Sequence, residues 1–327
     1  MSYSVRESSE DGFATVELID NGSDVKAVVV PQLGNNTIAL TLRGLNFLWR
    51  PDRTLRDLLA ARSLFGIPFL APWANRLSKK EYWVGDRCYQ LNASFGNLRF
   101  DHHGQVIHGL MLFEPWTVTE LEATSDGAQL VSRIQFSARP SLIAQFPFAH
   151  TLEMRHLLRD GRLQITLRIT SECMEPFPVS IGFHPYYVIP ETRRDDWQLQ
   201  LAARTRFELK GNQTPTGITM PVEQRLWAVK DVELDDVFSG LTRSKDGEAH
   251  FSIGCNSGSL KTGFGPHYKV AVVYAPRTHD FVCIEPMATI TNALHLRHEG
   301  FDVDLPMVDP GGSWEESFWM EPSLAVR

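Results

Sequence analysis

The sequence predicts an all-β protein built as a large antiparallel β-sandwich or barrel. Alternation of apolar and polar residues with a period of two dominates the chain, and helical periodicity is scarce. Turn signals recur about every ten residues, and almost no segment is suited to be a crossover helix. We therefore expect neighbouring strands to pair antiparallel through short turns.

Two hairpins are predicted where an Asx-Gly pair separates alternating segments, which is a strong short-range hairpin signal. Asn21-Gly22 lies in the first hairpin, within VELIDNGSDVKAVVV, and Asp160-Gly161 in the second, between TLEMRHLL and LQITLRIT. In LQITLRIT, one face of the strand carries Leu163, Ile165, Leu167 and Ile169. Such alternation is typical of a strand with one buried face.

Further strands are expected at LVSRIQFSA and KVAVVYA. The stretch SKDGEAHFSIGCNSGSLKTGFGPH is rich in glycine and serine, and we interpret it as a long loop that contains one short strand. The best helix candidate is TLRDLLAARS, where Thr54 is suited to cap the N-terminus. One face of this helix would carry Leu55, Leu58 and Leu59.

The composition is that of an ordinary soluble globular protein, with 327 residues, 43% hydrophobic and 22% charged. The sequence shows no internal repeat, low-complexity tract or clear linker, so we predict a single domain over residues 1–327. The formal net charge of -7 argues against nucleic acid or an anionic membrane as a partner. No run of about 20 apolar residues is present that would cross a membrane.

The N-terminal stretch MSYSVRESSEDGFATVELID has no basic head followed by an apolar segment, so we expect no secretory signal. The four cysteines are far apart and none forms a C-x-x-C pair; they are Cys88, Cys173, Cys255 and Cys283. We expect free thiols in a reducing compartment, and hence a cytoplasmic protein.

Five stretches carry residues suited to chemistry. The first, PFLAPWANRL, places Asn75 and Arg76 in an apolar and aromatic context. The guanidinium of arginine offers a fixed fork of donors that suits hydroxyl pairs or carboxylates. The alternative is that Arg76 pairs with a structural carboxylate.

The second stretch, RFDHHGQVIHGLM, holds His102, His103 and His108 beside Asp101. A metal site is one hypothesis, but adjacent histidines on a strand point to opposite faces, and no metal-binding motif follows. We therefore predict no metal and interpret the histidine pair as exposed loop residues. His108 differs because Gly109 follows it, and glycine lets a ligand approach the backbone closely.

The third and fifth stretches share one form: an apolar run, one ionisable residue and then a proline. The ionisable residue is His184 in SIGFHPYYVIP and Glu285 in HDFVCIEPMATITNA. Proline favours an extended conformation before it and cannot donate to a sheet ladder, so we expect both side chains at strand ends. An imidazole suits proton transfer near neutral pH, and a buried carboxylate is costly unless paired or functional. The alternatives are a core histidine and a structural ion pair.

The fourth stretch, VELDDVFSGL, contains Asp235 and Asp236, which alone indicate a turn or a solvated edge. No G-x-S-x-G nucleophile elbow, Walker loop or dinucleotide fingerprint is present in the sequence. One acid–base pair, His184 with Glu285, is therefore the most economical interpretation of the chemistry.

Taken together and in this order, NRL, HGL, HPYY, LDDVF and IEPM with TNA resemble the aldose 1-epimerase family, the galactose mutarotases. These motifs lie within residues 68–293, and PGGSWEESFWM near the C-terminus resembles the closing strand of the family. The resemblance implies a large antiparallel β-sandwich, the supersandwich, with the sugar in an open cleft on one sheet face.

The resemblance also implies residue roles. His184 would be the general acid and Glu285 the general base. The substrate-binding residues would be Arg76, His108, Asp235, Asn75 and Tyr186, with Asp236 as the alternative to its neighbour. An aromatic platform for the sugar would come from Trp73, Tyr186 or Tyr187.

The implied activity is interconversion of the α and β anomers of free hexoses such as glucose or galactose. One base and one acid on opposite sides of the hemiacetal suffice for ring opening and closure, so no cofactor is expected. A hexose-6-phosphate 1-epimerase is one alternative and would need more cations, for which Arg99, Arg193 and Arg194 are candidates. A carbohydrate-binding sandwich without turnover is another. The expected partner is a monosaccharide, and the chain is expected to be a monomer or a homodimer.

Overall fold

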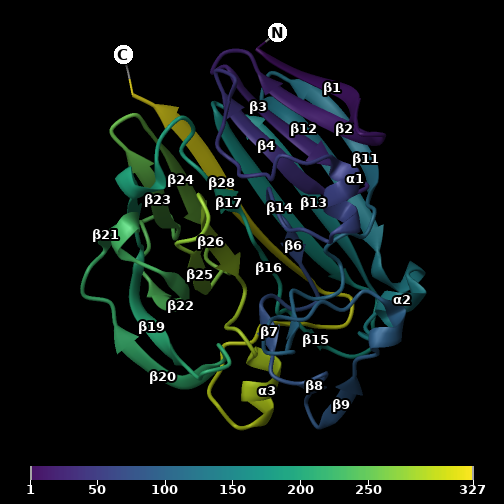
Figure 1. The fold of residues 1–327 in the computed structure, drawn as a ribbon. Coiled ribbons are helices and arrows are strands. Elements are labelled where there is room, and N and C mark those ends of the chain that lie inside the picture. Colours follow the sequence, from purple (N-terminus) through teal and green to yellow (C-terminus); the bar gives the residue numbers. More distant parts are fainter. Residues whose placement is uncertain (1, 326–327) are drawn as a thin grey trace.

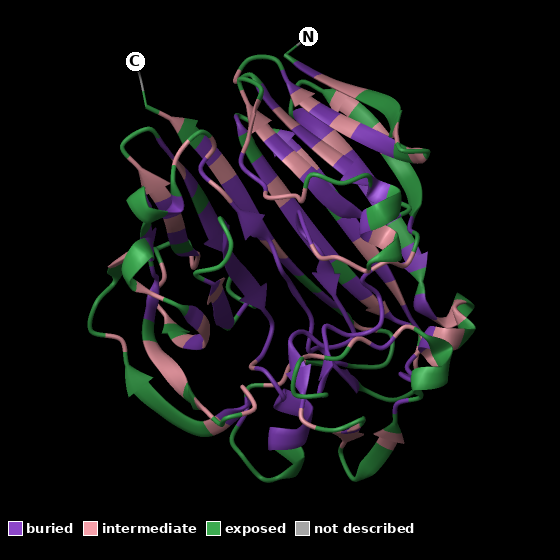
Figure 2. Ribbon diagram, in the orientation of Figure 1, coloured by how far each residue is buried: buried purple, intermediate pink, exposed green. Residues whose placement is uncertain are grey.

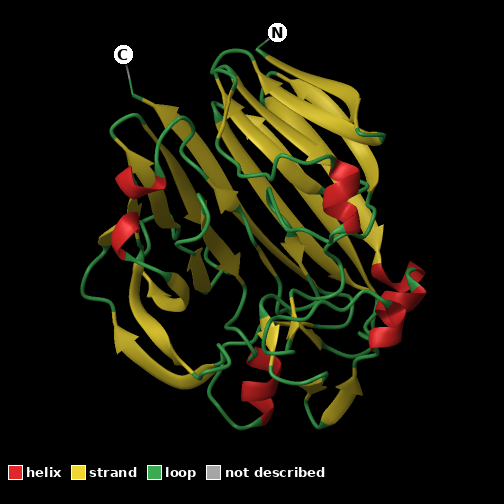
Figure 3. Cartoon of the chain, viewed as in Figure 1, coloured by secondary structure: helices red, strands yellow, loops and turns green. Residues whose placement is uncertain are grey.

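A computed structural model describes residues 2–325 of the chain, and within them the strands form three large antiparallel sheets (Figure 1). Helices are few and short, and they lie outside the sheets (Figure 3). Residues 1, 326 and 327 of the single domain expected over residues 1–327 lie outside the described residues, and the domain count stays a prediction.

The five-stranded sheet runs in chain order: β1 (Tyr3–Glu10), β2 (Phe13–Asp20), β3 (Val25–Val30), β4 (Asn36–Leu42) and β5 (Leu45–Asn46). The nine-stranded sheet has the order β11 (Thr117–Thr124), β12 (Gly127–Gln135), β13 (His150–Arg159), β14 (Arg162–Ser171), β28 (Ser313–Leu324), β24 (Gly258–Phe264), β23 (Ala249–Cys255), β18 (Gln198–Gln200) and β21 (Leu226–Ala228).

The eight-stranded sheet has the order β20 (Pro215–Pro221), β19 (Ala203–Leu209), β22 (Leu234–Leu241), β25 (Val270–Ala275), β26 (Val282–Met287), β16 (Gly182–Phe183) and β6 (Phe69–Leu70), and β17 (Tyr186–Tyr187) pairs with β26. Three pairs of short strands complete the β structure: β7 (Arg76–Leu77) with β10 (Val106–Ile107), β8 (Glu81–Val84) with β9 (Arg87–Gln90), and β15 (Phe177–Pro178) with β27 (Met307–Val308). The helices are α1 (Leu55–Ala60), α2 (Pro140–Ile143) and α3 (Ala293–His298), with 3₁₀ turns at Ala93–Phe95, Phe136–Ala138, Arg194–Asp196 and Val229–Asp231.

The sheets stack in two layers, so the predicted β-sandwich is confirmed. The five-stranded sheet covers one half of the nine-stranded sheet, because β1 and β2 contact β11 to β13 and β4 contacts β28. The eight-stranded sheet covers the other half. There the Phe183 ring packs on Phe318 of β28, with ring centroids 4.7 Å apart. Buried residues fill the space between the layers (Figure 2).

The five-stranded and eight-stranded sheets, which together form one layer, are joined along their edges. The Trp49 amide donates to the Tyr186 carbonyl (2.9 Å), and Leu48 forms a β-bridge with Tyr187. This junction fixes β17 between the two sheets.

No helix of the described chain is both long and apolar enough to cross a membrane.

The second predicted hairpin is confirmed in detail. β13 and β14 pair up to Arg159 and Arg162, and the intervening Asp160 and Gly161 both have positive φ, 51° and 74°. Such a two-residue turn matches the twist of the flanking strands.

The first predicted hairpin also forms, between β2 and β3, but its turn is not the expected one. The connection has four residues, and positive φ falls on Asp24 rather than on Asn21 or Gly22. The Asp20 carboxylate holds the turn, because Oδ1 accepts from the Gly22 amide (3.0 Å) and the Ser23 amide (3.2 Å).

The predicted helix is α1. Thr54 caps it as expected, since its Oγ1 accepts from the Asp57 amide at 3.1 Å. Leu55 and Leu58 are buried, and Leu59 is half-buried on the same face.

The interpretation of residues 244–267 as a loop with one short strand is wrong. This stretch holds β23 and β24, a hairpin inside the nine-stranded sheet. Its glycines mark close approach rather than a loop, because a Cβ on Gly263 would lie 2.3 Å from the Trp319 ring. Glycine inside a strand serves this purpose where a large neighbour crosses it.

Candidate active site

His184 and Glu285 lie opposite each other on neighbouring strands. β16 and β17 both pair with β26, through Gly182 with Met287 and Tyr186 with Cys283. The register is the same on both sides of the break at His184 and Pro185. His184 therefore faces Glu285, and its Nε2 lies 3.3 Å from Glu285 Oε1.

The expectation that both residues end strands is met only in part. His184 does stand where β16 stops, before the chain resumes as β17. Glu285 does not end its strand, because β26 continues through Pro286 to Met287. The pairing of β26 with β16 and β17 is interrupted beside Pro286. A residue without an amide N–H is tolerated at such an interruption.

One face of the eight-stranded sheet carries the ionisable residues. Asp235 pairs with Tyr274, Tyr274 with Cys283, and Cys283 with Tyr186. Residues directly opposite in a sheet share a face, as do residues two apart on one strand. Glu285 therefore shares this face with Asp235, and His184 with Tyr186.

Asp236 is on the opposite face and forms an ion pair with Arg206 (3.8 Å). Burial raises the pKa of the Asp236 carboxyl. Asp235, by contrast, lines the cavity that holds His184 and Glu285. Of the two adjacent aspartates, the register thus directs Asp235 toward the candidate site.

Two short strands, β7 and β10, carry the remaining predicted residues over this face. Arg76 of β7 pairs with Ile107 of β10, and the His108 amide donates to the Asn75 carbonyl at 2.9 Å. Asn75 and His108 both have positive φ, 54° and 66°. The backbone therefore bends sharply at both residues, beside the ends of the short strands.

We expected Gly109 to let a ligand approach the backbone. In the structure, another part of the chain lies there instead. With φ of 71°, it forms a parallel bridge to Ala71, and a Cβ on it would lie 2.0 Å from the Ala71 carbonyl oxygen. The close contact holds the His108 turn against the residue that directly follows β6.

These elements enclose one cavity of about 380 Å³. Its lining includes every predicted site residue: Asn75, Arg76, His108, His184, Tyr186, Asp235 and Glu285. Of the three aromatic candidates for a sugar platform, Tyr186 lines it. Trp73 and Tyr187 do not, because both are fully buried in the core.

The cavity also has residues that the sequence did not assign to it: Leu64, Arg99, Phe100, Asp101, His102, Ile107 and Tyr274. Tyr274 belongs to the predicted strand KVAVVYA. The alternation along that strand predicts the face on which Tyr274 lies, but it does not predict that Asp235 lies beside it on the next strand. His102 is exposed in a turn, as predicted, yet it reaches the cavity rim.

Arg76 pairs with carboxylates, as its alternative interpretation predicted, and it also lines the cavity. Its Nε donates to Asp101 (2.8 Å), its Nη2 to Asp235 (2.9 Å) and its Nη1 to Asn75 Oδ1 (3.2 Å). Burial opposes the charge, but the two carboxylates raise the pKa of Arg76 above its ordinary value. The result is a fixed cation that orients Asp235 in the cavity wall.

Asp101 ties the loop that follows Arg99 to this network. While its Oδ2 accepts from Arg76, its Oδ1 accepts from the backbone amides of His103 (2.9 Å) and Gln105 (2.9 Å). Burial acts to raise its pKa, but these bonds outweigh burial and lower it.

Burial favours the neutral forms of the central pair. It lowers the pKa of His184 to about 3 and raises that of Glu285 well above 4.5, with Asp235 adding to the rise. Burial therefore favours a proton on Glu285 over a proton on His184. Transfer across the 3.3 Å between Oε1 and Nε2 would give the ionic form with the same net charge.

Three buried atoms in the cavity lining have no hydrogen-bond partner among residues 2–325. They are Nδ1 of His108, Nδ1 of His184 and Oε2 of Glu285. The His108 ring also meets the His184 ring edge to face, with centroids 5.1 Å apart. Buried polar atoms are normally paired, so these three mark where a polar ligand is expected.

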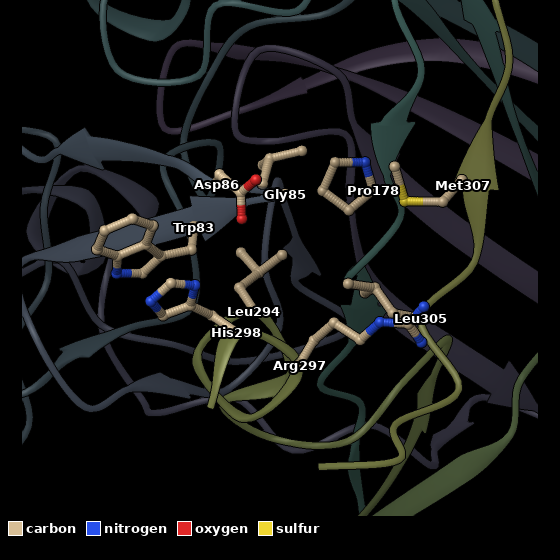
Figure 4. A pocket seen from close by; sticks show the side chains of 10 residues that line it. Trp83, Gly85, Asp86, Pro178, Leu294, Arg297, His298, Leu305 and Met307 are labelled. Atoms are coloured by element: carbon tan, nitrogen blue, oxygen red, sulfur yellow. The ribbon is translucent and has the colours of Figure 1, made fainter. Parts of the chain in front are cut away.

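A second cavity of about 380 Å³ lies between β8 and α3, where Trp83 stacks on His298 with centroids 3.8 Å apart (Figure 4). Its walls are mainly apolar, and the predicted site residues are all elsewhere. No group of three or more His, Cys, Asp or Glu side chains within the described chain is arranged to hold a metal ion.

The fold and the cavity define a class of protein: a two-layered β-sandwich with a polar cavity on one face of a sheet. The chain belongs to the aldose 1-epimerase family, whose family model matches residues 16–321.

Solved structures have the same fold. A galactose mutarotase-like protein from Clostridium acetobutylicum superposes with a TM-score of 0.87 at 17% identity, over 99% of each chain. The galactose 1-epimerase from Lactobacillus acidophilus gives a TM-score of 0.75 at 14% identity, again over 99% of each chain. The protein YihR of Escherichia coli (strain K12) is 24% identical over 151 residues, which span 45% of this chain and 44% of that protein.

Proposed function

We propose that this protein is an aldose 1-epimerase, a mutarotase, which interconverts the α and β anomers of free hexoses such as glucose or galactose. The observation that carries the proposal is the facing pair of His184 and Glu285 in a polar cavity. Family membership supports the reaction class.

The reaction needs one proton acceptor and one proton donor. In the proposed mechanism, the proton of the pair first moves from Glu285 to His184 across their contact. Glu285 then accepts the proton of the C1 hydroxyl while His184 donates its proton to the ring oxygen. The bond between C1 and the ring oxygen breaks and a C1 carbonyl forms. After rotation about the C1–C2 bond, the ring closes on the other face of the carbonyl and both protons return. Each placed group typically contributes about 10²–10⁴-fold.

The geometry modifies one expectation. We expected the acid and the base on opposite sides of the hemiacetal, whereas His184 and Glu285 lie side by side on one sheet face. The hydroxyl oxygen and the ring oxygen are bonded to the same carbon, so two neighbouring groups suffice to reach both. The net result of ring opening is that one proton passes from the C1 hydroxyl to the ring oxygen by way of the pair.

The other cavity residues are proposed to bind the sugar. Arg76 and Asp235, held in one ion pair, would bind hydroxyls together. His108 would use its unpartnered Nδ1 for the same purpose. Tyr186, which stacks on the His184 ring with centroids 4.7 Å apart, would hold that ring and contact the C–H face of the sugar.

Two alternative functions are less well supported. Of the three arginines considered for a phosphate dianion, Arg99 alone lines the cavity. Arg193 is exposed on the surface, and Arg194 donates to the backbone oxygens of Val229 and Ala275. A binding protein without turnover would not need an acid–base pair with unpartnered buried atoms.

We also propose that the protein is cytoplasmic. The described chain has four free cysteines, and free thiols favour a reducing compartment.

The proposal is tested by anomer exchange of α-D-glucose and α-D-galactose, measured by polarimetry and by exchange NMR. The parent protein should accelerate exchange, and the His184→Ala protein should lose at least about 10²-fold in kcat/KM while its circular dichroism stays unchanged. A folded His184→Ala protein with parental activity would contradict the assignment.

A further inference from the structure

The cavity contains a cation that the proposed mechanism does not use. Arg99 lines the cavity together with His184 and Glu285. Its Nη1 donates to the backbone oxygen of Arg62 at 2.6 Å. Among residues 2–325, no carboxylate oxygen forms an ion pair with its guanidinium.

Other arginines that are withdrawn from solvent have more partners. Arg76 donates to two carboxylates and an amide oxygen. Arg243 donates to four backbone oxygens. Arg99 has a single neutral acceptor, although a guanidinium offers five N–H donors. A partly desolvated cation without a counterion is costly, so its environment favours a bound anion.

The charge of Arg99 acts on the centre of the cavity. Burial lowers the pKa of the Arg99 guanidinium, and its charge in turn helps to lower the pKa values of His184 and His108. Arg99 and both histidines line the same cavity, so a molecule bound there would face all three side chains.

We propose that the preferred substrate is an aldose that carries one monoanionic oxyanion, a carboxylate or a sulfonate, and that Arg99 binds this group. The proposal rests on the proposed mutarotase function and names its substrate class. The planar fork of arginine matches an oxyanion and pairs with it through two hydrogen bonds.

A single negative charge fits better than a phosphate dianion. Arg62, whose backbone oxygen accepts from Arg99, uses its guanidinium to donate to the Gly96 oxygen (3.0 Å) and the Asn97 oxygen (3.5 Å), and it is outside the cavity lining. The other cavity arginine, Arg76, is already neutralised by Asp101 and Asp235. One free cation therefore remains, whereas a dianion needs more.

The test compares anomer exchange of four sugars by exchange NMR: D-glucose, D-glucuronate, a C6-sulfonated D-glucose and D-glucose 6-phosphate. The proteins are the parent, Arg99→Gln and Arg193→Gln, where Arg193 is an exposed arginine outside the cavity and serves as the matched control. In the parent, kcat/KM should be about 10- to 100-fold higher for a monoanionic sugar than for glucose, as expected for a charge-assisted hydrogen bond. Arg99→Gln should reduce this ratio to near one, and Arg193→Gln should keep it.

Binding provides a readout that does not depend on turnover. Glucuronate should raise the melting temperature of the parent and of Arg193→Gln more than an equal concentration of glucose does, and Arg99→Gln should lose this difference. Equal ratios in the parent and in Arg99→Gln would overturn the inference while leaving the mutarotase function intact. A preference for glucose 6-phosphate would also overturn it, in favour of a dianion site. Exchange absent with all four sugars would refute the proposed function, and the melting-temperature comparison would still decide the role of Arg99.

Discussion

The Nε2 atom of His184 lies 3.3 Å from Oε1 of Glu285, in a cavity where both residues are almost fully buried. The contact follows from strand register, because β16 and β17 pair with β26 in the same register on both sides of Pro185. Two ionisable groups so close should titrate and act as a unit.

This coupling predicts non-additive mutations. His184→Ala and Glu285→Gln should each lower kcat/KM for anomer exchange by at least about 10²-fold, and the double variant should be no worse than the poorer single variant. The reason is that either change removes the only proton relay in the proposed mechanism. The measurement is exchange NMR on the three variants, each checked for folding by circular dichroism. Losses that simply multiply in the double variant would mean that the two groups act independently.

The stability of the protein should depend on pH through Glu285. Its pKa is raised by burial above the unfolded value of 4.5, so unfolding releases a proton between 4.5 and the folded pKa. Stability contributed by this group therefore falls as pH rises through that window. Glu285→Gln removes the titration, and at pH 7 we expect its melting temperature to exceed the parent's by about 2–5 °C.

The melting-temperature difference should shrink as pH is lowered toward 4.5, where the unfolded carboxyl is also protonated. Glu7→Gln, a change at an exposed glutamate, is the matched control and should follow the parent at every pH. A Glu285→Gln protein that is less stable than the parent at pH 7 would show that Glu285 is stabilising when charged.

The pH dependence of activity should differ from that of an ordinary histidine enzyme. Burial lowers the pKa of His184 to about 3, so the imidazole does not gain a further proton from solvent between about pH 7 and pH 5. The profile of kcat/KM, which reports the free enzyme, should therefore stay flat from about pH 7 to pH 5. Anomer exchange measured across this range provides the check. An acid limb centred near pH 6.5 would indicate an exposed or unperturbed histidine instead.

Arg76 should act mainly in substrate binding, through the geometry that Asp101 imposes. Asp101→Asn weakens the bond to Arg76 Nε and the loop turn at His103, so KM for the sugar should rise about tenfold with a smaller change in kcat. Asp246→Asn, at an exposed position, is the control. A selective loss of kcat would instead assign Arg76 to the transition state.

The sequence predicted the sandwich, and the seven residues that its ordered motifs suggested line one cavity. Their roles in catalysis and binding stay predictions. The motifs do not contain the register between distant strands. That register places Tyr274 beside Asp235 and brings His184 opposite Glu285. Local periodicity gives the face of each residue but not its partner.

Two predictions about glycine residues were wrong, because a glycine in a sequence is compatible with a loop, with a ligand or with close packing. Gly263 was interpreted as part of a loop, and Gly109 as an opening for a ligand, yet both admit another segment of the protein. A glycine indicates that something comes close, and the sequence alone does not show what it is. Arg99 was likewise recognised as a candidate cation, but only the fold of the loop before β10 places it in the cavity.

Gly109 therefore provides a test of how the cavity is built. A methyl group there would lie 2.0 Å from the Ala71 carbonyl oxygen, at a φ of 71° that alanine disfavours. Gly109→Ala should destabilise the protein by more than about 3 kcal/mol and displace His108, with loss of activity in whatever fraction still folds. Gly85→Ala is the matched control, because its φ of 57° is also positive but nothing lies within 4 Å of the added carbon. It should cost only about 1 kcal/mol of backbone strain. Urea unfolding of both variants measures the difference, and equal losses would mean that the contact with Ala71 yields easily and does not hold the His108 turn in place.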